Sequence, residues 1–310
     1  MRVLVVSNPH ATATTARERD VLIRALGSDA ELDVAETANR GHAAALACRA
    51  MRNGTDVVVA FGGDGTVNEV VNGLLTDGVH NDVPALGVVP AGSTNVFARA
   101  LGLPRTPLEA TGVVLEALRT GSRRPVSMGR VNTGVDDRWF VFAAGMGFDA
   151  SIVAGVEKQR ARGKRSTHLL YARVGVREFF RSERRHPRLH VELPDGTRLD
   201  DIYFTIIANS DPWTYIGERP LRPTPEARFE AGLGLYARRR MSTVGLMFSM
   251  VRLSGKRPRI GKRGAVVIHD LAGLTILADE AMPVQVDGDY LGTREKLEFH
   301  SAKNAISVLV

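Results

Sequence analysis

The chain has little cysteine, few aromatic side chains and no long hydrophobic run. Its 310 residues contain one cysteine, which excludes an internal disulfide and a zinc site built on cysteines; the eight histidines show no metal-ligand spacing. Aromatic residues make up only 6%, and no RNA- or DNA-binding signature is present, so nucleic-acid binding is disfavoured. The apolar stretch at 244–253 is too short to span a membrane, and residues 3–6 are too short for a signal core. We therefore expect a cytoplasmic protein.

The chain also lacks an excess of acidic residues. Lys and Arg number 41 against 34 Asp and Glu, which gives a formal charge of +7 and a pI near 9.9. This balance favours anionic partners, such as nucleotides or acidic lipid surfaces, without choosing among them. The length fits two ordinary domains better than a single large one.

The first 125 residues alternate short apolar strands with amphipathic helices. Strands are predicted at 2–7, 31–36, 56–61 and 85–90, and helices at 16–26, 42–52, 67–75 and 107–120. Fully apolar strands joined by helices are typical of a parallel sheet that is covered on both faces. The pattern predicts an α/β class, with a doubly wound parallel-sheet domain at residues 1–126.

The remainder of the chain is rich in β patterns. Strands are predicted at 139–144, 188–193, 203–208, 265–269, 274–278 and 284–286, and several are separated by turn signals such as Asp195-Gly196. Helical segments are expected near 166–182 and 242–253. We predict a mainly antiparallel β-sandwich domain at residues 127–296, followed by a C-terminal strand, 297–310, that returns to the first domain.

The segment Gly62-Gly63-Asp64-Gly65-Thr66 joins the most apolar strand to a helix. Glycines allow a phosphate to approach the backbone without meeting a Cβ, and the first turn of the helix offers free N–H groups to an anion. Asp64 has the wrong sign to bind phosphate directly, which makes it a candidate magnesium ligand. The alternative is a tight turn in which Asp64 only caps the helix. No Gly-Lys-Ser/Thr follows, so the segment is not a Walker loop, and it is not a dinucleotide fingerprint.

Together with Asn68-Glu69, this loop resembles the catalytic domain of the diacylglycerol kinase and sphingosine kinase family, whose superfamily includes NAD kinases and phosphofructokinases. Three further segments agree: Asn8-Pro9, Thr37, and residues 90–99, which resemble the second glycine loop of the family. The resemblance implies ATP and Mg²⁺ as cofactors, with Asp64 as metal ligand and catalytic residue. It implies nucleotide contacts from Asn8, Pro9, Thr37, Gly62, Gly63, Gly65, Thr66, Asn68, Glu69, Gly92, Ser93, Thr94 and Asn95.

Two segments of the second domain resemble the lipid-kinase branch. Residues 142–149 are similar to its Gly-x-Asp segment, and Asp287-Gly288-Asp289 is similar to its late Asp-Gly-Glu loop. By position, the resemblance makes Asp289 the general base toward a lipid hydroxyl that enters between the domains, a role that suits a carboxylate. The alternative is a hairpin turn with an exposed Asp289.

The chain departs from the family pattern at three places. Val96 stands where an aspartate of the metal network is usual, and Ala231 removes a ligand of a second, structural metal site, so we do not predict that site. The first loop also lacks its usual Ser-Gly ending.

Basic clusters at 160–165, 181–188 and 256–263 are either solvated surface or a surface that meets anionic lipid head groups. Residues 169–180 fit an amphipathic helix that guides an acyl chain, or a helix of the core. We expect transient peripheral contact with the inner face of the membrane. The sequence leaves a homodimer open.

These features predict an ATP-dependent lipid kinase, with diacylglycerol as acceptor and phosphatidic acid as product. An NAD kinase is the first alternative; its separate downstream Asn-Glu pair is missing, since Asn132 is followed by Thr133. The second alternative is a nucleotide-binding regulatory protein without turnover, which Val96 keeps open.

Overall fold

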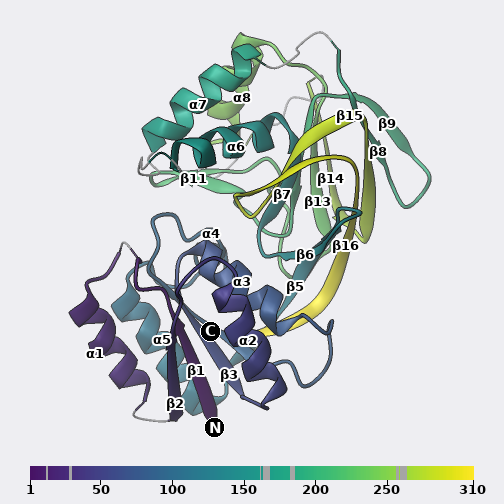
Figure 1. Ribbon diagram of the computed structural model, residues 1–310. Helices are drawn as coiled ribbons and strands as arrows, with labels where there is room; N and C mark the ends of the chain where they lie inside the picture. The colour runs from purple at the N-terminus through teal and green to yellow at the C-terminus, as the bar shows by residue number, and fades with distance from the viewer. Residues whose placement is uncertain are drawn as a thin grey trace. The chain divides into compact units, whose positions relative to one another are not determined.

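The computed structural model describes residues 1–11, 13–27, 30–160, 162, 168–181, 186–255, 258 and 264–310 (Figure 1). The chain forms two compact units: Met1–Met128 with Ala302–Val310 is the first, and Gly129–Ser301 is the second. The division after Met128 falls two residues from the boundary expected at 126, and the returning segment begins at Ala302 rather than at 297. Two strands pass from one unit to the other, β5 (Arg123–Asn132) and β16 (Asp289–Leu309).

The first unit is built on a parallel sheet in the order β2-β1-β3-β4-β16, the last strand taking part through its C-terminal end. Its other strands are β1 (Arg2–Ser7), β2 (Glu31–Glu36), β3 (Val57–Gly62) and β4 (Ala85–Pro90). All six residues of β3 and of β4 are buried, whereas β2 at the sheet edge is largely open to solvent. This burial is why the central strands are apolar throughout.

Helices cover both faces of this sheet. Figure 1 shows α1 (Ala16–Leu26) and α5 (Pro107–Thr120) on one face, and α2 (His42–Arg52) and α3 (Asp64–Leu74) on the other. Helix α1 begins with a capping box in which Thr15 and Glu18 satisfy each other's backbone N–H groups. The short helix α4 (Val96–Ala100) follows β4. The predicted doubly wound α/β class is confirmed.

The second unit is antiparallel, with the strand order β14-β13-β10-β7-β15-β16. Strands β6, β8 and β9 extend it, and a short hairpin, β11 with β12, stands apart. The bounds are β6 (Asp137–Phe140), β7 (Ala143–Gly147), β8 (Leu189–Glu192), β9 (Arg198–Ile202), β10 (Phe204–Ala208), β11 (Thr214–Ile216), β12 (Arg219–Leu221), β13 (Leu233–Arg238), β14 (Ala265–Leu271) and β15 (Gly273–Val286).

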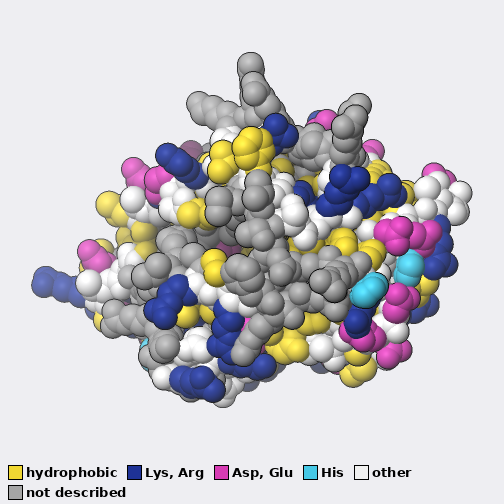
Figure 2. Space-filling model, turned by 90° about the horizontal axis from the view of Figure 1, so that it is seen from above, with side chains coloured by type: hydrophobic (Ala, Val, Ile, Leu, Met, Phe, Trp, Pro, Cys, Tyr) yellow, Lys and Arg dark blue, Asp and Glu magenta, His cyan; other side chains and the backbone are white. Residues whose placement is uncertain are grey.

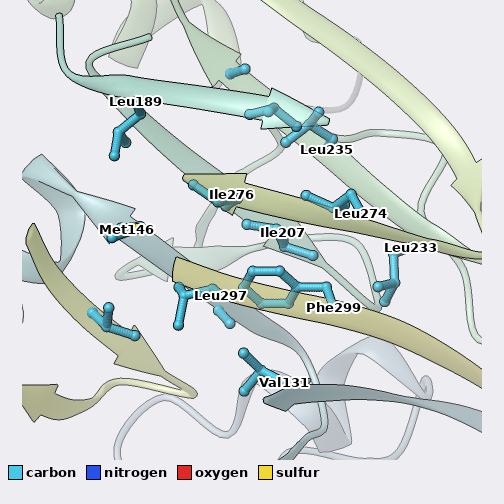
Figure 3. Close-up of a cluster of buried hydrophobic side chains, with 14 of the residues drawn as sticks. Val131, Met146, Leu189, Ile207, Leu233, Leu235, Leu274, Ile276, Leu297 and Phe299 are labelled. Carbon is cyan, nitrogen blue, oxygen red and sulfur yellow. The ribbon is translucent and has the colours of Figure 1, made fainter. Parts of the chain in front are cut away.

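Strand β15 pairs with different strands along its length. Its first part, Thr275 to Ala278, pairs with β8, and its last part, Val284 to Val286, pairs with β7; the register with β16 shifts between these parts. Buried side chains from both parts share one apolar core, shown in Figure 3 with Leu189, Ile276, Ile207 and Phe299 among the labelled residues. The predicted antiparallel class of this part of the chain is confirmed.

The described residues of the second unit also form three helices: α6 (Phe148–Arg160), α7 (His168–Arg181) and α8 (Thr243–Leu253). The sequence predicted α7 and α8 but did not predict α4 of the first unit, nor α6, β5, β9, β11, β12 and β13. Of these, β13 lacks the alternation that marks a strand because it is buried at every position, and α6 follows β7 without a loop. No helix in the described part of the chain is long and apolar enough to cross a membrane. Most of the basic clusters at 160–165, 181–188 and 256–263 lies outside the described residues.

Candidate functional site

Four segments singled out from the sequence lie at the carboxyl ends of neighbouring parallel strands in the first unit. Asn8 and Pro9 follow β1, Thr37 follows β2, the loop at 62–66 ends β3, and the loop at 90–95 ends β4. Parallel strands end at one edge of a sheet, where open α/β sheets bind ligands. Backbone hydrogen bonds connect the loops: Asn8 N–H donates to the Phe61 carbonyl at 3.0 Å, and Thr37 N–H donates to the Ser7 carbonyl at 2.9 Å.

The two glycine loops touch each other. Ala91 N–H donates to the Gly62 carbonyl at 2.8 Å, which sets Gly63 against Gly92. A Cβ on Gly92 would lie 2.6 Å from the Cα of Gly63, closer than real Cβ atoms come to backbone. Glycine is therefore required at this crossing by the close approach of two backbones.

Asp64 ties the first loop to helix α4. Its Oδ2 accepts from the Val96 N–H at 3.0 Å and its Oδ1 from the Phe97 N–H at 3.1 Å, so the carboxylate caps the helix that follows the second loop. Burial raises the pKa of Asp64, while these N–H donors and the charge of Arg99 act to lower it. Asp64 is therefore a helix cap, as the alternative interpretation stated. The helix that it caps is α4, however, and not α3, which begins at Asp64.

A cavity of about 430 Å³ opens beside the second loop. Asn95 shapes it by closing the loop on itself: its Oδ1 accepts from Gly92 N–H at 3.0 Å and its Nδ2 donates to the Gly92 carbonyl at 2.9 Å. Arg99 and Arg105 line the cavity, which places two cationic side chains at its wall. Its walls are Pro90, Gly92, Ser93, Thr94, Asn95, Ala98, Arg99, Pro104, Arg105 and Thr106. The sequence did not single out Pro104 to Thr106, since nothing in their pattern tells that they face the loop.

The first turn of α3 is open to a ligand. Helix α3 begins at Asp64, three residues earlier than predicted, and no side chain of the described residues caps it. Gly65 is exposed, with open space where a Cβ would stand, whereas Thr66 is buried against Gly62. The free N–H groups of this turn are therefore accessible to an anion.

Asn68 and Glu69 contact protein. Asn68 is 1% exposed, and its Oδ1 accepts from Asn72. The Glu69 carboxylate accepts from the N–H groups of Gly41 at 2.9 Å and Ala43 at 3.1 Å, which caps α2 behind Thr37. The structure thus gives both side chains supporting roles, and their predicted nucleotide contacts rest on the resemblance alone.

The oxygen ligands near Asp64 could hold a magnesium ion only loosely. Each oxygen of Asp64 already accepts one N–H, Val96 offers no oxygen from its side chain, and no group of three His, Cys, Asp or Glu among the described residues could hold a metal. Mg²⁺ commonly keeps several waters and binds one or two carboxylates plus the phosphates of a substrate. The residues fit such an ion, with Asp64 as its single protein carboxylate.

In the second unit, Asp287 and Asp289 lie at the β15–β16 hairpin and have different surroundings. Asp287 is 8% exposed, and its carboxylate accepts from the N–H groups of Val141 at 2.7 Å, Phe142 at 3.0 Å and Ala143 at 3.0 Å. Asp289 is partly exposed and forms an ion pair with Arg138, with 2.8 Å between Oδ2 and Nη2. The hairpin is therefore present, and Asp289, the predicted base, is held by an arginine rather than fully solvated.

A buried acid supports this hairpin from inside. Gln285 Nε2 donates to Asp149 Oδ2 at 2.9 Å, and Gln285 Oε1 accepts from Gly288 N–H at 3.0 Å. Burial raises the pKa of Asp149 to about 7, against the lowering effect of the Gln285 hydrogen bond. The sequence pointed to residues 142–149 but gave no role to Asp149 or Gln285, because 136 residues separate them.

The fold and the loops define the class: a doubly wound α/β unit with glycine loops at the carboxyl edge of its sheet, joined to an antiparallel unit. The family model described as "Diacylglycerol kinase catalytic domain" matches residues 2–131. A diacylglycerol kinase of Bacillus subtilis is 46% identical over 93 residues, 30% of this chain and 27% of that relative. The resemblance predicted from the sequence is confirmed for this part of the chain. The match to the Bacillus subtilis relative spans well under half the length of that relative.

Solved structures extend the likeness of the fold to the whole chain. A diacylglycerol kinase of Bacillus anthracis superimposes with a TM-score of 0.73 at 18% identity, covering 99% of this chain and 96% of that one. An NAD kinase of Archaeoglobus fulgidus, solved in complex with ATP, gives a TM-score of 0.51 at 12% identity, with 100% and 94% covered. Both comparisons show the fold alone.

Proposed function

We propose that the protein is an ATP-dependent lipid kinase that transfers the γ-phosphoryl group to a lipid hydroxyl, with diacylglycerol as acceptor and phosphatidic acid as product. One observation carries the proposal: two glycine loops cross at the carboxyl edge of the sheet beside an open helix start and a cavity lined by two arginines. Backbone N–H groups and guanidinium groups are the donors that phosphoryl transfer uses to bind and orient phosphates.

In this proposal the first unit binds the nucleotide. The phosphates lie along Gly63, Gly65 and Gly92, with Ser93 and Arg105 on the cavity side. Asp64 holds α4 and thereby the second loop, and it contributes to Mg²⁺ binding. Mg²⁺ supplies charge neutralisation of the phosphates when it is bound.

Asp289 acts as general base in the proposed reaction. A partly exposed carboxylate can accept the proton of an acceptor hydroxyl, and the ion pair with Arg138 fixes its orientation. Asp287 and Gln285 hold the hairpin that carries it. The names of the relatives, which are diacylglycerol kinases, support a lipid alcohol as the acceptor.

A labelled-phosphate assay tests the proposal. The protein is incubated with γ-labelled ATP and Mg²⁺ and, in separate reactions, with diacylglycerol, a sphingoid base, ceramide, NAD or no acceptor. Label in phosphatidic acid is the expected result. Label in NADP would contradict the lipid kinase proposal and support an NAD kinase. Saturable ATP binding without transfer to any acceptor would support a regulatory nucleotide-binding protein, the alternative that Val96 keeps open.

The assay is repeated with Asp289→Asn and Asp289→Glu. A base contributes about 10²–10⁴-fold, so Asp289→Asn should lose activity by that factor with an unchanged KM for ATP, while Asp289→Glu retains part of it. Full activity of the Asn variant would remove Asp289 from the mechanism.

A further inference from the structure

Helix α8 exposes large apolar side chains to solvent. Phe248 is 58% exposed and Val251 is 71% exposed, although the second unit buries most of its other apolar residues. The opposite face is fixed to the unit: Ser249 Oγ donates to Gly245 at 2.7 Å and accepts from Arg238 Nη1 at 2.6 Å, and Leu253 is buried. The spacing of Gly245, Ser249 and Leu253 by four residues makes them one face of the helix, so Phe248 and Val251 lie on another.

Exposed arginines accompany this apolar face. The Arg252 guanidinium lies 4.7 Å from the centroid of the Phe248 ring, and Arg239 and Arg240, just before α8, are exposed. The sequence contains no Asp or Glu from Ala231 to His269. Figure 1 places α6, α7 and α8 at the same end of the second unit, and Figure 2, which looks onto that end, shows hydrophobic side chains beside Lys and Arg.

We infer that Phe248, Val251 and Arg252 form a docking surface for an anionic lipid bilayer, on which α8 lies with its apolar side chains among the acyl chains and its arginines at the phosphates. This deepens the proposed function, because a lipid kinase must reach an acceptor that resides in a membrane. Exposed apolar residues flanked by cations are the features that bind helices to anionic interfaces.

The positive charge of the α8 surface favours an anionic membrane over a second copy of the chain as its partner. A symmetric dimer through α8 would bring Arg252 and its neighbours of both copies together, and no acidic residue of residues 231–269 could offset them. An anionic bilayer offers the opposite sign across the whole face.

Sedimentation with vesicles tests the inference. Vesicles of equal parts phosphatidylglycerol and phosphatidylcholine are compared with vesicles of phosphatidylcholine alone. We expect binding to the anionic vesicles that weakens with salt, and a loss of about tenfold in affinity for the double variant Phe248→Ser with Val251→Ser and for Arg252→Glu. Val135→Ser is the matched control, since Val135 is 74% exposed on a turn of the same unit; it should bind like the wild type.

Two further readouts separate this inference from the proposed function. All variants should keep the wild-type thermal unfolding temperature, and the double variant should turn over a short-chain acceptor in solution at the wild-type rate. Vesicle binding of the double variant within a factor of about two of the wild type would overturn the inference. So would equal binding to both kinds of vesicle, or a dimer in solution that the double variant abolishes without any vesicle binding.

Discussion

The main-chain N–H of Val96 donates to the Asp64 carboxylate at 3.0 Å, at the position where the resembling family usually has a second aspartate. The side chain at this position, that of Val96, is instead an apolar group that is 2% exposed and offers no metal ligand. The backbone of residue 96 still engages Asp64, so the link between the two glycine loops is kept while the metal donor is lost. Because of this link, we make a specific prediction for a substitution of each residue, Asp64 and Val96.

Asp64→Asn is expected to abolish phosphoryl transfer and to lower the free energy of unfolding by about 1–3 kcal/mol, because the amide N–H₂ would face a backbone N–H donor at the start of α4. Thermal unfolding and the γ-label assay measure the two effects. Asp77→Asn, which removes an exposed partner of Arg52, is the control and should change little. Near-normal transfer by Asp64→Asn would contradict the metal role of Asp64, and unchanged thermal unfolding would contradict its role as a cap.

Val96→Asp is expected to lower the free energy of unfolding by about 2–4 kcal/mol without metal, since it buries a second carboxylate near Asp64. Two carboxylates form a better Mg²⁺ site than one, so added Mg²⁺ should stabilise the variant more than the wild type. Calorimetry with EDTA measures the free energy of unfolding without metal, and calorimetry with Mg²⁺ measures the stabilisation by the ion. An equal response of the two proteins to Mg²⁺ would show that residue 96 does not face the metal position.

Asp149→Asn is expected to change how stability depends on pH. The pKa of Asp149 is raised to about 7 in the folded protein, above its value in the unfolded chain. Its contribution to stability is therefore full below about pH 4 and is lost as the pH rises toward 7. The amide has no charge to bury, so the variant should be more stable than the wild type at pH 8, by roughly 1–3 kcal/mol.

Denaturant unfolding at several pH values measures the effect of Asp149→Asn. Asp136→Asn, at an exposed position of the same unit, serves as control. Parallel stability curves for Asp149→Asn and the wild type between about pH 4 and pH 8 would refute the assignment of this pH dependence to Asp149.

Arg105→Ala is expected to weaken ATP binding by about tenfold, the effect of losing one hydrogen bond to a charged group. Titration calorimetry with ATP and with adenosine measures it, and only ATP binding should change, because the arginine faces the phosphates in the proposed function. Arg123→Ala, at an exposed position of the same unit away from the cavity walls, is the control. Equal losses for ATP and adenosine would place the phosphates elsewhere.

Local sequence was sufficient for the first unit. Strands β1, β2 and β4 and helices α1, α2 and α5 lie at the predicted residues, because each carries its own period of apolar residues and its own caps. The loops that follow β1, β3 and β4 were recognised from glycine, asparagine and proline, whose backbone preferences act locally. Parallel pairing then brings the loops to one edge.

Local sequence predicted the structure less well where the partners of an element or side chain are distant along the chain. Strand β13 was missed, since burial at every position removes the alternation that marks a strand, and helix α6 was missed because it follows β7 without a loop. Glu69 was assigned to the nucleotide, but its carboxylate caps α2, a partner that no spacing along the chain reveals.

By itself, the sequence determined the α/β class, the antiparallel second part and the glycine loops, because periodicity and turn chemistry are properties of neighbouring residues. Only the tertiary structure decided that Asp64 caps α4, that Arg99 and Arg105 share a cavity and that Asp149 supports the hairpin of Asp289 through Gln285. Hydrogen bonds and burial depend on distances in space, and these are set by how the strands pair and the layers close.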